Sequence, residues 1–190
     1  KHQKLSEIFM KEALVIRNEP STYRISSLTN QLRTLINESA GDDLFKEKLK
    51  TMKYIERGSN KLLKYLFATL NEYHKWYDEG TTGNPKPEKG KIINFEDVSI
   101  EHIFSQSPQS GDIKPEELED VNELRNLTLL TLKENGEKVK NKPYVTKRTV
   151  YIDSEYDINK KFEAYEEWNA ESMDSWLEYI LDLSCKVFVI

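Results

Sequence analysis

Apolar residues recur at helical spacing near both ends of the chain. Residues 24–36 and 59–77 each place their apolar side chains on one helical face, and Ser59 stands in the position of an N-cap. A third such face lies in the aromatic segment that follows Phe162. It consists of Trp176, Tyr179, Ile180, Leu183 and Val187. The pattern predicts helices at both ends of the chain, with the aromatic tail packed into a core.

Between these helices the pattern changes to short β-prone runs. Residues 79–90 are rich in glycine and proline, which marks a break in the chain. Two β-prone segments follow, at 91–104 and 126–132, and the acidic stretch 114–126 between them is typical of a short solvated helix. Residues 133–141 are suited to another short helix. The order of elements predicts an α+β fold, mainly helical.

These breaks divide the chain into four predicted parts. We expect a helical subdomain at 1–80, a linker at 81–92, a core at 93–160 and a C-terminal helical segment at 161–190 that packs on the core. The first residue is lysine and not methionine, so we expect the chain to be part of a longer protein.

Composition narrows the class of protein. Hydrophobic residues make up 37 % of the 190 residues and charged residues 32 %, with both signs interspersed, which indicates a globular chain with a core. No apolar run approaches the roughly 18 residues that span a bilayer, and no signal peptide is visible, so we expect a cytoplasmic protein. The single cysteine, Cys185, excludes an internal disulfide framework and a Cys-rich zinc site, and we interpret it as a small core residue.

Charge is distributed unevenly along the chain. The formal net charge is -5, yet the segment from Lys133 to Arg148 holds six basic residues against Glu134 and Glu137. Binding to nucleic acid requires only a local positive surface, so this segment is a candidate contact region for a phosphate backbone.

Four polar residues of the middle region are suited to metal-assisted phosphodiester hydrolysis. Glu101 offers a carboxylate oxygen and Asn135 an amide oxygen, and both suit a hard divalent cation. His102 offers an imidazole that is neutral and basic near physiological pH, as the activation of water requires. Asn126, at the entry to the second β-prone run, is placed to brace the loop that presents His102.

The pair Glu101–His102 is ambiguous on its own. Taken alone, it is more simply a polar pair at the end of a strand, and only the ordered set with Asn126 and Asn135 favours chemistry. Neighbouring side chains of a regular strand point to opposite faces. A common site for Glu101 and His102 therefore requires the strand to end or bulge at these residues.

Two motifs carry a family resemblance. EHIFSQS at 101–107 and ELRNLTLLTLKENGEKVKNKPYVTK at 123–147 closely resemble the C-terminal HNH nuclease domain of GmrSD-type modification-dependent restriction enzymes, a family that includes SspE-like phosphorothioate-sensing defence proteins. The outline is also similar to the HNH domain of RNA-guided CRISPR nucleases. Ser105 stands where the family often has proline, and Arg125 where it usually has glycine. Arg125 is therefore expected to avoid the positive φ that glycine adopts readily.

The resemblance implies a ββα-metal (HNH) finger embedded among flanking helices, within residues 93–160. It implies that His102 is the general base, that Asn126 braces its loop, and that Glu101 and Asn135 hold one divalent metal ion, Mg²⁺ or Mn²⁺. It also implies contacts with double-stranded DNA, modified or unmodified. The expected contact residues are Lys138, Lys140, Asn141, Lys142, Lys147 and Arg148.

The implied activity is that of a nicking DNA endonuclease in bacterial restriction or anti-phage defence. The resemblance further implies an N-terminal nucleotide-hydrolysing sensor domain outside this chain, and a homo-oligomer wherever both DNA strands are cut. The alternative is a catalytically degenerate HNH module that serves as a DNA-binding or assembly domain.

Overall fold

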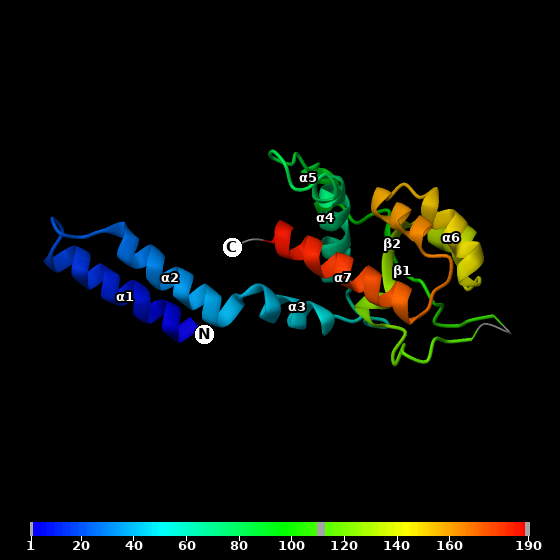
Figure 1. Cartoon of the computed structure of the whole chain (residues 1–190), viewed down its shortest axis with the longest axis horizontal. Coiled ribbons are helices and arrows are strands. Elements are labelled where there is room, and N and C mark those ends of the chain that lie inside the picture. Colours follow the sequence, from blue (N-terminus) through cyan, green and yellow to red (C-terminus); the bar gives the residue numbers. More distant parts are fainter. Residues whose placement is uncertain (1, 110–112, 189–190) are drawn as a thin grey trace. The chain divides into compact units, whose positions relative to one another are not determined.

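The computed structural model describes residues 2–109 and 113–188, and the chain forms two compact units whose boundary falls between Lys48 and Leu49 (Figure 1). The first unit contains helices α1 (His2–Asn18) and α2 (Ile25–Ala40). Glu12 of α1 is buried and accepts hydrogen bonds from Ser27, at 3.0 Å, and from Gln31 of α2. Helix α3 (Asp42–Lys50) begins in this unit and ends in the second. The helix predicted at 24–36 is confirmed.

The second unit combines helices with one small sheet. Its elements are α4 (Lys61–Asp78), α5 (Lys89–Ile93), β1 (Val98–His102), the 3₁₀ helix η1 (Leu124–Asn126), β2 (Leu127–Thr131), the π-helix η2 (Glu134–Val139), α6 (Tyr144–Ile152), the 3₁₀ helix η3 (Asp157–Ala164) and α7 (Ala170–Val187). This confirms the α+β, mainly helical fold. None of the described helices combines the length and apolar character that crossing a bilayer requires.

Several local expectations differ from the structure. The β-prone segment 91–104 begins in helix α5, and its strand starts only at Val98. The acidic stretch 114–126 forms turns and η1 instead of a solvated α-helix, because side chains such as Asp120 bond the nearby backbone and Leu118 is buried. Ser59 is not the N-cap of α4, which begins at Lys61.

Strands β1 and β2 form an antiparallel pair with a regular register. Glu101 lies opposite Thr128, and His102 lies opposite Leu127. Directly after the strand, the Ile103 N–H donates to the Asn126 carbonyl at 2.9 Å. The pairing therefore continues to the end of β1, without a bulge at Glu101 and His102.

Side chains form hydrogen bonds with the backbone groups at the outer edge of β2, the edge that does not pair with β1. Trp176 Nε1 donates to the Leu127 carbonyl at 3.0 Å, and Asn159 Nδ2 donates to the Leu129 carbonyl at 2.6 Å. The Thr131 N–H donates to Glu134 Oε2 at 3.0 Å. Because an exposed strand edge invites pairing with other chains, these contacts close the sheet on this side.

An aromatic cluster joins α6, η3 and α7 beside the sheet. The ring of Phe162 lies 4.9 Å from that of Tyr151 and 4.9 Å from that of Trp176, measured between centroids. All three side chains are fully buried, and Ile180, Leu183 and Cys185 of α7 are buried as well. The aromatic tail and Cys185 therefore belong to the core, as predicted.

Replacing Trp176 with phenylalanine should test the closure of β2. The variant keeps an aromatic ring but loses the indole N–H, so the buried Leu127 carbonyl lacks its donor. We expect the free energy of unfolding to fall by about 1–3 kcal/mol, measured by urea denaturation followed by circular dichroism. Leu62→Ala, at a side chain that is 67 % exposed, serves as control and should change stability by less than about 0.5 kcal/mol. Equal effects of the two variants would contradict this account.

Candidate active site

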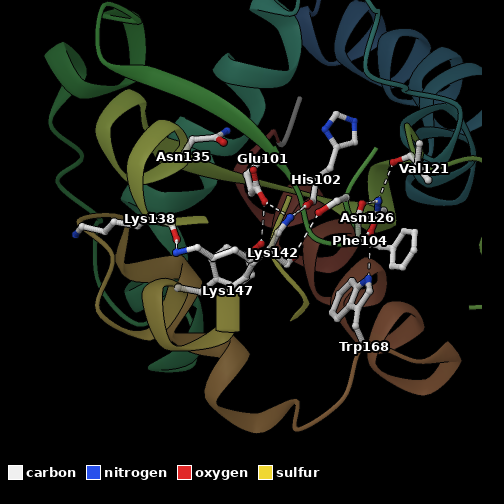
Figure 2. A network of polar contacts seen from close by, with 12 residues as sticks. Glu101, His102, Phe104, Val121, Asn126, Asn135, Lys138, Lys142, Lys147 and Trp168 are labelled. Atoms are coloured by element: carbon white, nitrogen blue, oxygen red, sulfur yellow. Dashed lines mark hydrogen bonds and ion pairs between the residues drawn. The ribbon is translucent and has the colours of Figure 1, made fainter. Parts of the chain in front are cut away.

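Glu101 and His102 end strand β1 and make contacts on different sides of it. Figure 2 shows the Glu101 carboxylate turned towards Lys147, while the His102 ring points away from that pair. This follows from the regular strand, in which consecutive side chains alternate between faces. In this structure the two residues are neighbours along the backbone, but their functional groups are not brought together.

Glu101 is a buried carboxylate with a buried cationic partner. Lys147 Nζ lies 2.6 Å from Glu101 Oε1, and the Tyr151 hydroxyl donates to the same oxygen at 3.2 Å. Burial raises the pKa of Glu101, and the positive charge of Lys147 opposes that rise. Lys147 also donates to the His102 carbonyl at 2.7 Å, so its ammonium group connects two consecutive residues of β1.

Asn135 lies beside the same strand, at the start of η2. Its Nδ2 donates to Ser99 Oγ at 2.9 Å and to the Ile100 carbonyl at 3.4 Å. Ser99 and Glu101 are two residues apart in β1 and therefore share one face. The structure thus places Asn135 on the side of β1 that carries Glu101.

The oxygen donors on this face fit the chemistry of a hard divalent ion. Among the described residues, the side-chain hydrogen bonds to Glu101 come from Lys147 and Tyr151, and both reach Oε1. Asn135 uses Nδ2 in its hydrogen bonds, and its Oδ1 accepts none from the described residues. A carboxylate and an amide oxygen completed by waters are a common ligand set for Mg²⁺. In the described ranges no three His, Cys, Asp or Glu side chains gather into a fuller metal cluster.

Asn126 anchors the loop that follows β1. Its Oδ1 accepts from the Phe104 N–H at 2.7 Å and from Trp168 Nε1 at 3.1 Å. Its Nδ2 donates to the carbonyls of Phe104, at 2.9 Å, and Val121, at 2.8 Å. The side chain is fully buried with all four hydrogen-bonding positions filled (Figure 2). This geometry ties the loop after His102 to the start of β2 and to the C-terminal segment.

His102 is 7 % exposed, and within the described part of the chain its ring makes one hydrogen bond, between Nε2 and Asn122 Oδ1 at 3.0 Å. The ring of Tyr54 packs against it edge to face, with centroids 4.7 Å apart. Burial lowers the pKa of His102 to about 4, although the hydrogen bond to Asn122 acts in the opposite direction. The imidazole is therefore neutral at physiological pH.

The residues expected to contact DNA lie in different environments. Lys138, Lys140 and Asn141 are exposed, and Lys142 donates to the Lys138 carbonyl at 2.6 Å. Lys147 is buried in its pair with Glu101. Arg148 donates to the carbonyls of Phe162, at 3.0 Å, and Glu163, at 2.6 Å, so it supports the junction of α6 with η3.

The sequence motifs do not include two residues that contact His102. Asn122 and Tyr54 contact His102, yet they lie outside the motifs, in segments without a chemical signal of their own. His74, a histidine away from these residues, is buried in α4, and burial lowers its pKa. Arg125 has no positive φ, so glycine is not required at that position for the backbone angle.

Comparison with known families assigns the chain to a class. Residues 39–183 match the model of the C-terminal domain of GmrSD restriction endonucleases. The matched class is that of nucleases in restriction defence, whose substrate is DNA. The chain belongs to the GmrSD restriction endonuclease C-terminal domain family. No curated protein is significantly similar to it in sequence.

Removal of the Lys147 charge should be costly unless Glu101 is neutralised as well. Lys147→Met leaves a buried carboxylate without its cation, and we expect the free energy of unfolding to fall by about 3–5 kcal/mol. The double variant Glu101→Gln/Lys147→Met should regain a large part of that loss. Lys138→Met, at an exposed lysine, is the matched control for loss of charge. Urea denaturation measures these proteins together with the single variant Glu101→Gln, and effects of the two substitutions that simply add in the double variant would contradict a coupled pair.

Stability should depend on pH through His102. Its folded pKa of about 4 lies below the value of about 6.5 for an unfolded histidine, so the unfolded chain binds more protons between these values. The stabilisation is complete above about pH 6.5 and is lost as the pH falls towards 4, by about 3 kcal/mol in total. We expect His102→Gln to lose less stability than the wild type between pH 7 and 4.5, in urea titrations with EDTA. Parallel curves for the two proteins would contradict the lowered pKa.

Proposed function

We propose that this chain is a metal-dependent DNA endonuclease domain that nicks one strand of double-stranded DNA, with His102 as the general base. One observation carries the proposal: Glu101 and Asn135 present hard oxygen atoms on one face of β1, directly before the histidine that ends the strand. The family of restriction endonucleases supplies the substrate class.

Glu101 and Asn135 would hold one Mg²⁺ or Mn²⁺ ion. Such an ion, when bound, offsets the negative charge that develops on the phosphodiester during attack. Glu101 would contribute Oε2, since Lys147 and Tyr151 fix the carboxylate through Oε1. Asn135 would contribute Oδ1, since its Nδ2 is fixed on Ser99. Each ligand would thus be oriented by a contact through a different atom of the same side chain.

His102 would take a proton from the attacking water. The ring is neutral at physiological pH, and a neutral imidazole has a lone pair that accepts a proton. Glu101 and His102 are consecutive residues at the end of β1, and a phosphate lying across that end would have to contact side chains from both faces of the strand. The in-line attack places the negative charge on the leaving 3′ oxygen, and the products carry 5′-phosphate and 3′-hydroxyl ends.

A single site of this kind cuts a single strand, so a nick is the expected product. Exposed Lys138, Lys140 and Asn141 lie next to the candidate ligand Asn135 in the chain and would contact the phosphate backbone. Such contacts make DNA binding sensitive to salt. A double-strand break requires two copies of the domain, and a nucleotide-hydrolysing sensor domain outside this chain would control the cleavage.

A second candidate function is a catalytically degenerate module that binds DNA or supports assembly. The ion pair between Glu101 and Lys147 favours it, because the proposed metal ligand is buried and already has a cationic partner. The two candidates share the fold and the DNA contacts. They differ in whether the phosphodiester is hydrolysed.

Plasmid nicking separates the two candidates. With Mg²⁺ or Mn²⁺, the wild type should convert supercoiled DNA to the nicked form, and His102→Ala should slow this by at least about 10²-fold, because general-base catalysis is lost. DNA binding measured in EDTA should stay equal for both proteins. His74→Gln changes a buried histidine outside the site and is the matched control, with unchanged nicking.

The degenerate module gives a different result in the same assay. Wild type and His102→Ala would then bind DNA equally and leave the plasmid supercoiled with either metal. The same outcome in the full-length protein would rule out the catalytic proposal, because an absent sensor domain could no longer explain the inactivity.

A further inference from the structure

The hydrogen bond between His102 and Asn122 belongs to a short chain of polar side chains. Asn122 Oδ1, which faces His102 Nε2 at 3.0 Å, also accepts from Gln106 Nε2 at 3.0 Å. The same Gln106 Nε2 donates to Glu56 Oε1 at 3.4 Å. These hydrogen bonds therefore connect the exposed carboxylate of Glu56 to the ring of His102, the candidate base.

The chemistry of these side chains determines which group donates and which accepts in each of these hydrogen bonds. An ionised carboxylate only accepts hydrogen bonds, so Glu56 requires the amino end of the Gln106 amide. The amino group of Gln106 donates one hydrogen to Glu56 and the other to Asn122. Asn122 must therefore accept with the oxygen of its amide. Oδ1 is an acceptor, so Nε2 of His102 must be the nitrogen that carries the proton.

The other ring nitrogen then carries the lone pair. Nδ1 of His102 makes no hydrogen bond with the described residues. A neutral imidazole with a proton on Nε2 accepts protons at Nδ1 only. Nδ1 is therefore the nitrogen that would accept a proton from the attacking water.

Asn122 itself is held at both backbone ends. Its N–H donates to Asp120 Oδ1 at 2.9 Å, and its carbonyl accepts from the Tyr54 N–H at 2.9 Å. Tyr54 is the residue whose ring packs on His102. The segment around Tyr54 thus fixes both the Asn122 backbone and the imidazole plane.

We propose that Asn122 is a positioning residue that sets the tautomer of His102, with Gln106 and Glu56 orienting the Asn122 amide, so that Nδ1 is the catalytic base. The consequence for cleavage rests on the proposed nuclease function, whereas the tautomer is a property of the protein alone. A purely structural role for Asn122 would not select one ring nitrogen over the other.

The ¹⁵N chemical shifts of the ring nitrogens report the tautomer directly. For the whole chain in EDTA at pH 7, we expect the shifts of His102 to show a proton on Nε2. Asn122→Ala should remove this preference, whereas Asn122→Asp keeps an acceptor and should retain it. Gln106→Ala leaves Asn122 in place and should weaken the preference, which covers the case that Asn122→Ala does not fold. Asn84→Ala, at an exposed asparagine, should change nothing.

Nicking kinetics test the catalytic consequence. Asn122→Ala should lower kcat about 10–100-fold, the usual size for loss of a residue that orients a functional histidine, with DNA affinity in EDTA unchanged. In the His102→Ala background the same substitution should have no further effect, because it acts through the imidazole.

The outcomes distinguish failure of this inference from failure of the proposed function. A proton on Nδ1 in the wild type overturns the inference, and so does a tautomer that Asn122→Ala and Gln106→Ala leave unchanged. A proton on Nε2 that depends on Asn122, together with a full-length protein that does not nick DNA, supports the positioning and overturns the nuclease proposal. A further loss of nicking when Asn122→Ala is added to His102→Ala overturns a role of Asn122 through the ring.

Discussion

The site is built on a two-stranded sheet, and the backbone N–H and C=O groups at the outer edges of this sheet need hydrogen-bond partners. Two strands alone are marginal in water, and each presents a row of unpaired backbone groups. Side chains of Trp176, Asn159 and Glu134 bond the outer edge of β2. On β1, Asn135 bonds the Ile100 carbonyl and Lys147 bonds the His102 carbonyl. The sheet is therefore held by side chains that lie outside its two strands, and two of these residues, Asn135 and Lys147, are also candidate site residues.

This double use explains the geometry at Glu101. Lys147 is buried because it closes the end of β1, and the same ammonium group then balances the buried carboxylate. Asn135 turns its amino end to the sheet, so its oxygen remains for another partner. Structure and candidate chemistry thus depend on the same side chains, and a change at either residue would affect both.

His102 is surrounded by a separate set of contacts. Its hydrogen bond with Asn122 and the ring of Tyr54 hold it on the far side of β1 from the Glu101–Lys147 pair. Because the strand is regular to its end, the backbone alone keeps the carboxylate and imidazole apart. A substrate that lies across the end of the strand is what would bring their functions together.

Much of the fold and the identity of the candidate site could be predicted from local patterns. Helical spacing predicted α2, α4 and α7, and the β-prone run at 126–132 predicted β2. Both signals depend only on residues that are close together in the sequence. Residues 91–104 and 114–126 were harder to predict, because buried contacts of Ile92 and Leu118 and local side-chain bonds override their propensity. The sequence by itself determined the family motif and the order of Glu101, His102, Asn126 and Asn135. Only the tertiary structure decided that Lys147 is buried against Glu101 and that Asn122 bonds His102, since both contacts join segments 20 or more residues apart.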